Sequence, residues 1–241
     1  MEKVFFEKIN DKKIFCCFSN TNSRQKKVII MSHGFRGNST GPARQFVDFQ
    51  RLLNKEGFSV LRLDLPNSGN SEGDFVDVSY DEWVETIVHF AKKYIELGYE
   101  VSLLGQSMGA AATVVATSKK DIKNSIGCIL LWVPGVNAEE FRGKNDDIFE
   151  EDGQKYKGKY WIEAKNSDFF KCLEQYKGAI HLVYGEMDKY ISSDLRKKVI
   201  EIVERKGESS MILNGQGHSP WEYNTAQEVF KQEIDKLKAL A

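Results

Sequence analysis

Short apolar runs recur along this chain and alternate with segments of helical spacing. Each run is almost continuous, as expected for a strand whose two faces are both buried. Strands that alternate with helices in this way predict a parallel sheet with helices on both of its faces. The runs occupy residues 27–31, 58–65, 100–105, 126–133, 179–185 and 209–214.

Two further strands and five helices complete the predicted order. Segments 3–9 and 13–19 flank an Asn10-Asp11 turn signal and predict an antiparallel hairpin ahead of the parallel strands. Helical patterns cover residues 42–56, 79–97, 108–119, 192–205 and 221–240. We therefore expect a single α/β domain over residues 1–241, built on a mostly parallel, eight-stranded sheet with helices on both faces.

Residues 134–178 interrupt this alternation. The segment shows no convincing buried strand, yet it is rich in aromatic residues. A connection of this length between two core strands is uncommon unless it has a function. We predict a small cap inserted at 134–178, with an ordinary helical excursion of the core as the alternative.

The charge balance and the hydropathy exclude several kinds of partner. Lys and Arg total 34 against 35 Asp and Glu, and no basic run stands out, so we expect no nucleic-acid binding. No stretch approaches about 18 consecutive apolar residues, which excludes insertion into a membrane by a helix. The first ten residues lack the pattern of a signal peptide, so we expect a cytoplasmic protein.

Histidines, cysteines and glycines give no sign of a metal or a cofactor. The four histidines show no HxxxH or HxH spacing, and the four cysteines form no CxxC pair. No G-x-G-x-x-G opens a helix after the first parallel strand. We therefore expect neither metal nor cofactor, and the sequence leaves the oligomeric state open, with a homodimer as one alternative.

The pentapeptide GQSMG at residues 105–109 is the most specific motif in the chain. It matches G-x-S-x-G between an apolar strand and a helix of small residues, which is the setting of a nucleophile elbow. The turn is so tight that strand and helix can approach only past small neighbours, and Gly105, Gly109 and Ala110 meet that need. We predict that Ser107 is a nucleophile.

A serine hydroxyl needs a base to become a good nucleophile. His218 lies in a Gly-rich loop after the last predicted strand, which brings it to the sheet edge of Ser107. Asp188 follows the preceding strand and would orient the histidine, with Glu186 as its local alternative. Three such residues at three strand ends, in the order Ser, Asp, His, form a far more specific signal than any one of them.

Acyl transfer also needs donors for the oxyanion that develops in the transition state. The expected pair is the backbone N–H of Met108, directly after the nucleophile, and that of Phe35, in the loop after the first parallel strand. His33 in that loop is expected to hold it by hydrogen bonds. The candidate substrate-binding walls are aromatic, with core filling as the alternative for the first and last: Trp132, Tyr160, Trp161 and Trp221.

These motifs resemble the α/β-hydrolase superfamily over nearly the whole chain. Within it, the chain resembles small bacterial cinnamoyl/feruloyl esterase-like serine hydrolases through HGFRGN at 33–38, SGNSEG at 68–73, GEMDKYI at 185–191 and GH at 217–218. The resemblance implies a short cap where residues 134–178 fall, and it implies the triad and oxyanion roles position by position. The sequence departs from the group at Gln106, where histidine is frequent, and at residues 66–69.

Together these residues predict a serine esterase that cleaves small-molecule carboxylic esters through an acyl-enzyme, with aryl, cinnamoyl or short-to-medium acyl groups as candidates. Thioesterase, monoacylglycerol lipase and peptidase activities share the triad and are alternatives. A non-catalytic, ligand-binding descendant of the fold is a more distant alternative, and the intact triad argues against it. Because the imidazole must be neutral to act as a base, we expect activity to fall below about pH 6–7.

Overall fold

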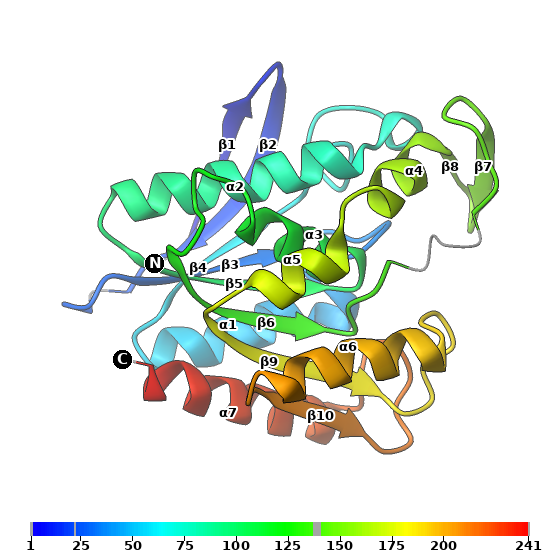
Figure 1. Ribbon diagram of the computed structural model, residues 1–241. Coiled ribbons are helices and arrows are strands. Elements are labelled where there is room, and N and C mark those ends of the chain that lie inside the picture. Colours follow the sequence, from blue (N-terminus) through cyan, green and yellow to red (C-terminus); the bar gives the residue numbers. More distant parts are fainter. Residues whose placement is uncertain (1, 22, 137–140, 241) are drawn as a thin grey trace.

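Eight strands form one mostly parallel sheet in the computed structural model, which describes residues 2–21, 23–136 and 141–240 (Figure 1). The order across the sheet is β1-β2-β4-β3-β5-β6-β9-β10. The pairs β1–β2 and β2–β4 are antiparallel and the other pairs are parallel. The sheet confirms the predicted fold class. The strands are β1 Glu2–Ile9, β2 Lys12–Ser19, β3 Lys27–Ser32, β4 Ser59–Leu63, β5 Glu100–Gln106, β6 Ile126–Trp132, β9 Ala179–Gly185 and β10 Ser209–Leu213.

Helices cover both faces of this sheet (Figure 1). The helices α1 (Gln45–Lys55) and α7 (Tyr223–Ala239) contact each other on one face, whereas α2 (Tyr80–Glu96) and α3 (Met108–Thr117) contact each other on the opposite face. The helix α6 (Ser193–Arg205) packs on β9 and β10. Because both faces are covered, β3 and β4 are buried along their whole length, which explains their continuous apolar sequences.

The predicted boundaries hold to within a few residues, and the largest shift is at the first helix. The expected start at residue 42 is a separate 3₁₀ turn, η1 (Pro42–Arg44), and the α-helix begins at Gln45. Ala43 and Arg44 have φ values of 45° and 67°, in the left-handed region, so the helical path is broken between the two elements. Within the described ranges, no helix combines the length and apolarity that crossing a membrane requires.

The segment between β6 and β9 (residues 134–178) is called the insertion below. Its residues 148–157 lie beyond one end of the main sheet, whereas its residues 169–175 lie over one face of the sheet beside α3 (Figure 1). Its strands β7 (Ile148–Glu151) and β8 (Gln154–Lys157) pair as a separate antiparallel hairpin, and α4 (Lys159–Lys165) and α5 (Phe169–Gln175) follow. The eight strands of the main sheet lie outside this segment, as its sequence indicated. The insertion packs against α2, α3 and the 3₁₀ turn η2 (Phe75–Asp77), so it is held by the core next to the strand ends.

Candidate active site

Ser107 occupies the turn between β5 and α3. Its backbone has φ 54° and ψ −122°, a conformation that a non-glycine residue adopts only when its surroundings enforce it. Gly109 allows α3 to approach the loop after β3, because a Cβ at this position would collide with the carbonyl oxygen of His33. The turn therefore has the geometry of a nucleophile elbow, which projects the serine hydroxyl from the end of a strand.

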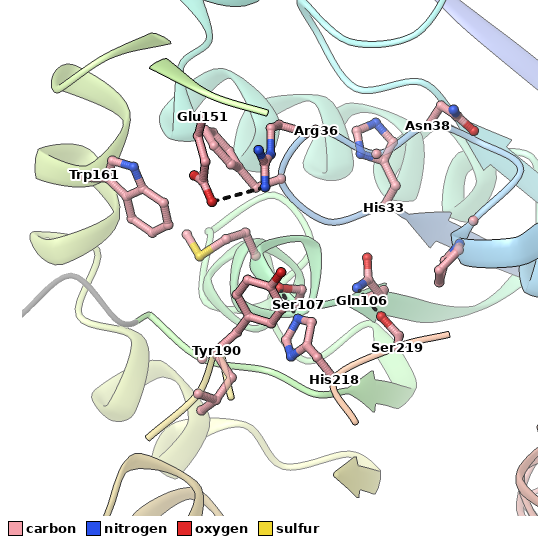
Figure 2. Close-up of a pocket in the computed structure, with 17 residues that line it drawn as sticks. His33, Arg36, Asn38, Gln106, Ser107, Glu151, Trp161, Tyr190, His218 and Ser219 are labelled. Atoms are coloured by element: carbon pink, nitrogen blue, oxygen red, sulfur yellow. Dashed lines mark hydrogen bonds and ion pairs between the residues drawn. The ribbon is translucent and has the colours of Figure 1, made fainter. Parts of the chain in front are cut away.

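The three residues predicted as a triad lie in one chain of hydrogen bonds. His218 Nε2 is 2.8 Å from Ser107 Oγ (Figure 2). On the other side of the ring, His218 Nδ1 is 2.8 Å from Asp188 Oδ2. Asp188 follows β9 and His218 follows β10, so both loops leave the sheet at the edge that carries Ser107. Gly185 permits the close approach of these loops, since a Cβ there would collide with the Gly217 carbonyl oxygen.

Asp188 is fixed as a carboxylate that faces the histidine. Its burial would raise the pKa of the carboxyl, but the hydrogen bond and charge of His218 and two backbone hydrogen bonds outweigh burial and hold the pKa below its ordinary value. The N–H groups of Tyr190 and Ile191 donate to Oδ1 at 2.8 and 3.1 Å. Oδ2 is left for His218 Nδ1, so the proton of a neutral imidazole sits on Nδ1 and Nε2 can accept from Ser107.

The two N–H groups predicted for the oxyanion hole belong to the segments beside Ser107. Met108 is the first residue of α3, so its N–H has no carbonyl partner within the helix and lies at the positive end of the helix dipole. Phe35 lies in the turn after β3, which Gly37 N–H closes by donating to the Gly34 carbonyl at 2.9 Å. Over the residues that the structure describes, Phe35 N–H has no acceptor. Neither N–H has an acceptor among the described residues, so both remain candidate donors to a substrate oxygen.

His33 holds the loop that carries Phe35, in the structural role expected for it. Its Nε2 accepts the Leu65 N–H at 2.9 Å, which requires the proton on Nδ1, and Nδ1 donates to the Gly34 carbonyl at 2.8 Å. Burial lowers the pKa of His33 to about 4. The imidazole is therefore neutral at physiological pH and fixes the loop without adding charge beside the triad.

A cavity of about 540 Å³ opens over Ser107 and His218 (Figure 2). A volume of this size suits a small-molecule ligand. Its other walls combine apolar and charged side chains, among them Phe35, Trp161, Arg36 and Glu151. Of the four aromatic residues expected as substrate-binding walls, Trp161 lines this cavity.

The structure corrects the expectation for Trp132 and Trp221, which do not line the cavity. Trp132 is fully buried and stacks on Phe230, and its Nε1–H donates to Glu233 Oε1 at 2.8 Å. Trp221 is buried against Trp132, with ring centroids 5.2 Å apart. Both indoles fill the core between the sheet and α7, which was the alternative that the sequence left open.

Tyr160 is also corrected, for a different reason. It belongs to the insertion as expected, but its ring is fully buried between the insertion and the core, against Trp83 and Tyr80. Phe35 covers it on the cavity side, with ring centroids 4.7 Å apart. Tyr160 therefore supports a cavity wall without forming one.

Sequence reasoning missed several residues that line the cavity, among them Arg36, Gln106, Glu151 and Tyr190. From sequence, Gln106 is only a departure from the resembling group. In the structure, its Oε1 accepts the Gly34 N–H at 2.8 Å and its Nε2 donates to Ser219 Oγ at 3.0 Å. Adjacency to Ser107 and Phe35 could have pointed to Gln106 and Arg36, whereas Glu151 has no local signal because a hairpin of the insertion brings it there.

Comparison with known proteins finds a similar sequence family and similar folds. The family described as serine aminopeptidase, S33, matches residues 23–139. No curated protein matches the sequence. The structure of ferulic acid bound to Est1E from Butyrivibrio proteoclasticus is similar to this chain, with a TM-score of 0.84, 19% identity, and coverage of 97% of this chain and 99% of that one.

Two further solved structures have the same fold with other named activities. A monoacylglycerol lipase from Paleococcus ferrophilus has a TM-score of 0.76 and 16% identity, with coverage of 95% of this chain and 99% of the lipase. The thioesterase domain from the curacin biosynthetic pathway has a TM-score of 0.68 and 14% identity, with coverage of 98% and 99%. At these identities the likeness establishes the fold, and a substrate has to be argued from the site.

Proposed function

We propose that this chain, which has the α/β-hydrolase fold and resembles feruloyl esterase-like enzymes, is a serine hydrolase of small-molecule carboxylic esters. The observation that carries the proposal is the unbroken chain of hydrogen bonds from Asp188 through His218 to Ser107, which ends in the cavity. Each residue has the neighbour that its role requires, and the nucleophile faces open space for a substrate.

The reaction proceeds in two steps. Ser107 Oγ attacks the ester carbonyl while His218 Nε2 takes its proton, and the oxyanion is stabilised by the N–H groups of Phe35 and Met108. The imidazolium, stabilised by Asp188, returns the proton to the departing alcohol, which leaves an acyl-enzyme. Water, deprotonated by His218, then attacks the acyl carbonyl. When the C–O bond to Ser107 breaks, His218 returns this proton to Ser107 Oγ, and the acid is released.

The acyl group is aryl, cinnamoyl or a short-to-medium chain. Phe35 and Trp161 give the cavity apolar aromatic walls, which favour a planar or aliphatic group, and its volume of about 540 Å³ limits the length. The ferulic acid named in the similar Est1E structure supports the aryl choice. In this proposal, residues 134–178 act as a cap inside a single domain, because they supply Trp161 and Glu151 to the cavity.

Thioesters, monoacylglycerols and peptides are the competing substrates, since all of them react through the same triad. The similar structures include a monoacylglycerol lipase and a thioesterase domain, so monoacylglycerols and thioesters remain alternative substrates. A ligand-binding protein without turnover is the alternative from another class. These possibilities differ in leaving group and in the reactivity of Ser107, so one set of assays separates them.

The test is turnover by the purified protein on p-nitrophenyl esters of increasing acyl length, methyl ferulate, a monoacylglycerol, an acyl thioester and a p-nitroanilide. Ser107→Ala should abolish turnover. Ser118→Ala, which removes a hydroxyl at the opposite end of α3, is the matched control and should leave it unchanged. Preference for methyl ferulate supports a cinnamoyl ester, and preference for the thioester or the anilide would replace the ester proposal.

A fluorophosphonate probe covers the case in which no substrate is turned over. Labelling of Ser107 without turnover would mean that the protein does not act on any of the tested substrates. The ester proposal would then be withdrawn, while the assignment of Ser107 as a nucleophile would be supported. Absence of both labelling and turnover would favour the ligand-binding alternative.

A further inference from the structure

Arg36 has a backbone conformation that arginine rarely adopts. Its φ is 62°, in the left-handed region, at the third position of the turn from Gly34 to Gly37. Glycine would take this conformation without strain, whereas a residue with a Cβ costs about 1 kcal/mol there. A strained backbone conformation persists only where contacts with the surrounding structure hold it in place. The contacts of the Arg36 side chain are therefore candidates for what holds this turn.

The guanidinium of Arg36 reaches across to the insertion. Its Nη1 lies 2.8 Å from Asp152 Oδ2 and its Nη2 lies 3.2 Å from Glu151 Oε1, and Figure 2 shows the second of these ion pairs. Glu151 is the last residue of β7, and Asp152 follows it in the turn of the β7–β8 hairpin. The Arg36 side chain is 19% exposed, whereas those of Glu151 and Asp152 are 44% and 79% exposed. The guanidinium is therefore largely shielded from water, while the carboxylates that face it are solvated, so each ion pair is expected to be worth about 1 kcal/mol or less.

The neighbouring residue, Phe35, is tied to the same part of the insertion. Its ring lies 5.0 Å from that of Tyr156 on β8 and 5.3 Å from that of Trp161 on α4, measured between centroids. On the core side, Gly34 N–H is held by Gln106. The peptide that carries the Phe35 N–H therefore lies between one anchor in the core and two in the insertion.

We propose that Arg36 is a positioning residue, through which Glu151 and Asp152 of the insertion hold the turn that aims the Phe35 N–H at the reacting oxygen. The insertion then forms part of the oxyanion hole, in addition to walling the cavity. An oxyanion donor acts only when it points at the site where charge develops, and complete loss of one donor costs about 10²–10³ in rate. A turn that is loosened but still present should lower the rate by a smaller factor than complete loss of the donor. The kinetic half of this proposal rests on the proposed function, and the structural half does not.

Asp152 is the residue at which the proposal is tested. Its side chain is 79% exposed and does not line the cavity, so its replacement leaves the substrate contacts in place. In contrast, Arg36 and Glu151 both line the cavity, and their replacement alone would mix positioning with binding. We expect Asp152→Asn to lower kcat about two- to fivefold at unchanged KM for every acyl length, and Glu151→Gln/Asp152→Asn to lower it about tenfold.

Matched controls separate the ion pair from the general charge of the hairpin. Glu150→Gln removes an exposed carboxylate from the adjacent position of β7, and Asp146→Asn/Glu150→Gln matches the double variant in charge. Both controls should keep the wild-type kcat. Asp152→Glu retains a carboxylate that can reach Arg36 and should restore most of the loss. Urea unfolding of each variant checks that the fold is intact.

Hydrogen exchange measured by mass spectrometry on the peptide over residues 33–41 supplies a readout that needs no substrate. The amides of the turn should exchange faster in Asp152→Asn than in Glu150→Gln, whether or not the ester proposal holds. Equal exchange in the two variants would overturn the proposal. So would faster exchange with an unchanged kcat, or a lower kcat with unchanged exchange, because the turn would then not connect the hairpin to the reaction. Absence of turnover by the wild type would remove the proposed function alone.

Discussion

Gln106 accepts the Gly34 N–H at 2.8 Å, and its carboxamide also donates to Ser219 Oγ at 3.0 Å. Gly34 begins the turn that carries the Phe35 N–H, and Ser219 directly follows His218. One buried side chain beside Ser107 thus joins the loop of the proposed oxyanion donor to the loop of the proposed base, and Figure 2 shows its contact with Ser219.

Gln106→Ala should therefore lower kcat about tenfold, with a smaller change in KM. Each lost hydrogen bond is worth about 1 kcal/mol, and about 1.4 kcal/mol corresponds to a factor of ten in rate. Ser219→Ala removes only one of the two bonds and should cause a smaller loss. Steady-state kinetics on a p-nitrophenyl ester measures both. A wild-type kcat in Gln106→Ala would show that the loops hold their positions without this bridge.

Asp188→Asn should lower kcat by about 10³–10⁴ with little change in KM. The amide nitrogen would face His218 Nδ1 and favour a proton on Nε2, which could then no longer accept the Ser107 proton. Glu186→Gln is the matched control, because Glu186 is the other carboxylate of this loop and its Oε2 accepts the Gly215 N–H at 2.9 Å. A larger loss in Glu186→Gln than in Asp188→Asn would reverse the assignment.

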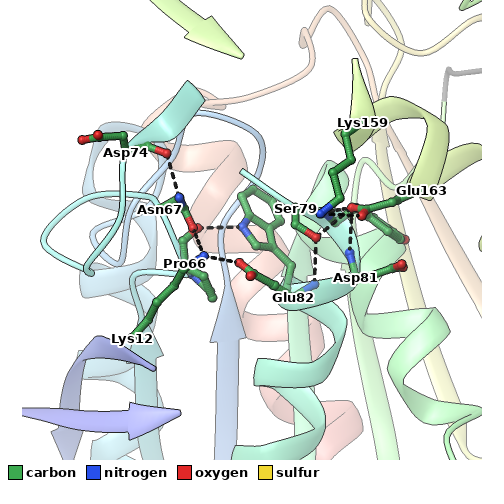
Figure 3. Close-up of polar contacts among 11 residues, drawn as sticks. Lys12, Pro66, Asn67, Asp74, Ser79, Asp81, Glu82, Lys159 and Glu163 are labelled. Atoms are coloured by element: carbon green, nitrogen blue, oxygen red, sulfur yellow. Dashed lines mark hydrogen bonds and ion pairs between the residues drawn. The ribbon is translucent and has the colours of Figure 1, made fainter. Parts of the chain in front are cut away.

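Glu163 of the insertion caps a helix of the core. Its Oε2 accepts the Ser79 hydroxyl and the Tyr80 N–H, each at 2.8 Å, at the start of α2 (Figure 3). A carboxylate at this position satisfies N–H groups that lack helical partners and faces the positive end of the helix dipole. The insertion and α2 should therefore stabilise each other.

Glu163→Ala should lower the free energy of unfolding by about 1–2 kcal/mol, as expected for the loss of a helix cap with its partners left buried. Glu163→Gln keeps an acceptor oxygen and should lose less. Glu85→Ala, on the exposed face of α2, should change the free energy by less than about 0.5 kcal/mol. Urea unfolding measures all three. Equal stability of Glu163→Ala and Glu85→Ala would mean that the carboxylate adds nothing to the docking.

The sequence predicts the sheet and the positions of Ser107, Asp188 and His218 because each depends on a local pattern. A buried strand must be apolar on both faces, and a nucleophile elbow needs small residues at fixed spacings. The strand ends then bring the three side chains to one edge of the sheet, which requires only the topology. No local sequence pattern of this kind specifies how the insertion packs against the core.

The residues that line the cavity could not all be predicted from the sequence. Trp132 lies near the end of the predicted strand 126–133, and Trp161 lies in the segment 134–178. Their sequence surroundings do not distinguish an indole of the core from one that lines the cavity. The difference arises from partners that are distant in the chain: Glu233 on α7 holds Trp132 in the core, and Phe35 supports Trp161 at the cavity. For the same reason, the contact of Glu151 with Arg36 appears only once the hairpin is placed.

Glu233 combines complete burial with an incomplete set of partners. Its Oε1 accepts from Trp132 Nε1 at 2.8 Å and lies 3.3 Å from His181 Nδ1, while Oε2 has no partner in the ranges that the structure covers. Burial raises the pKa of Glu233 above 4.5, and the hydrogen bonds from His181 and Trp132 only partly offset it. Burial of the protonated carboxyl group therefore costs less free energy than burial of the carboxylate.

This shift fixes the sign of a pH effect on stability. Between pH 4.5 and the raised pKa, folded Glu233 retains a proton that the unfolded chain has released, so the free energy of unfolding falls as pH rises through this window. Glu233→Gln keeps an acceptor for Trp132 and does not titrate. Its stability relative to the wild type should therefore increase with pH across the window and level off above it. Urea unfolding over a pH series measures the difference, with Glu228→Gln on the exposed face of α7 as the control. A difference between Glu233→Gln and the wild type that is constant with pH would show that Glu233 titrates alike in the folded and unfolded chain.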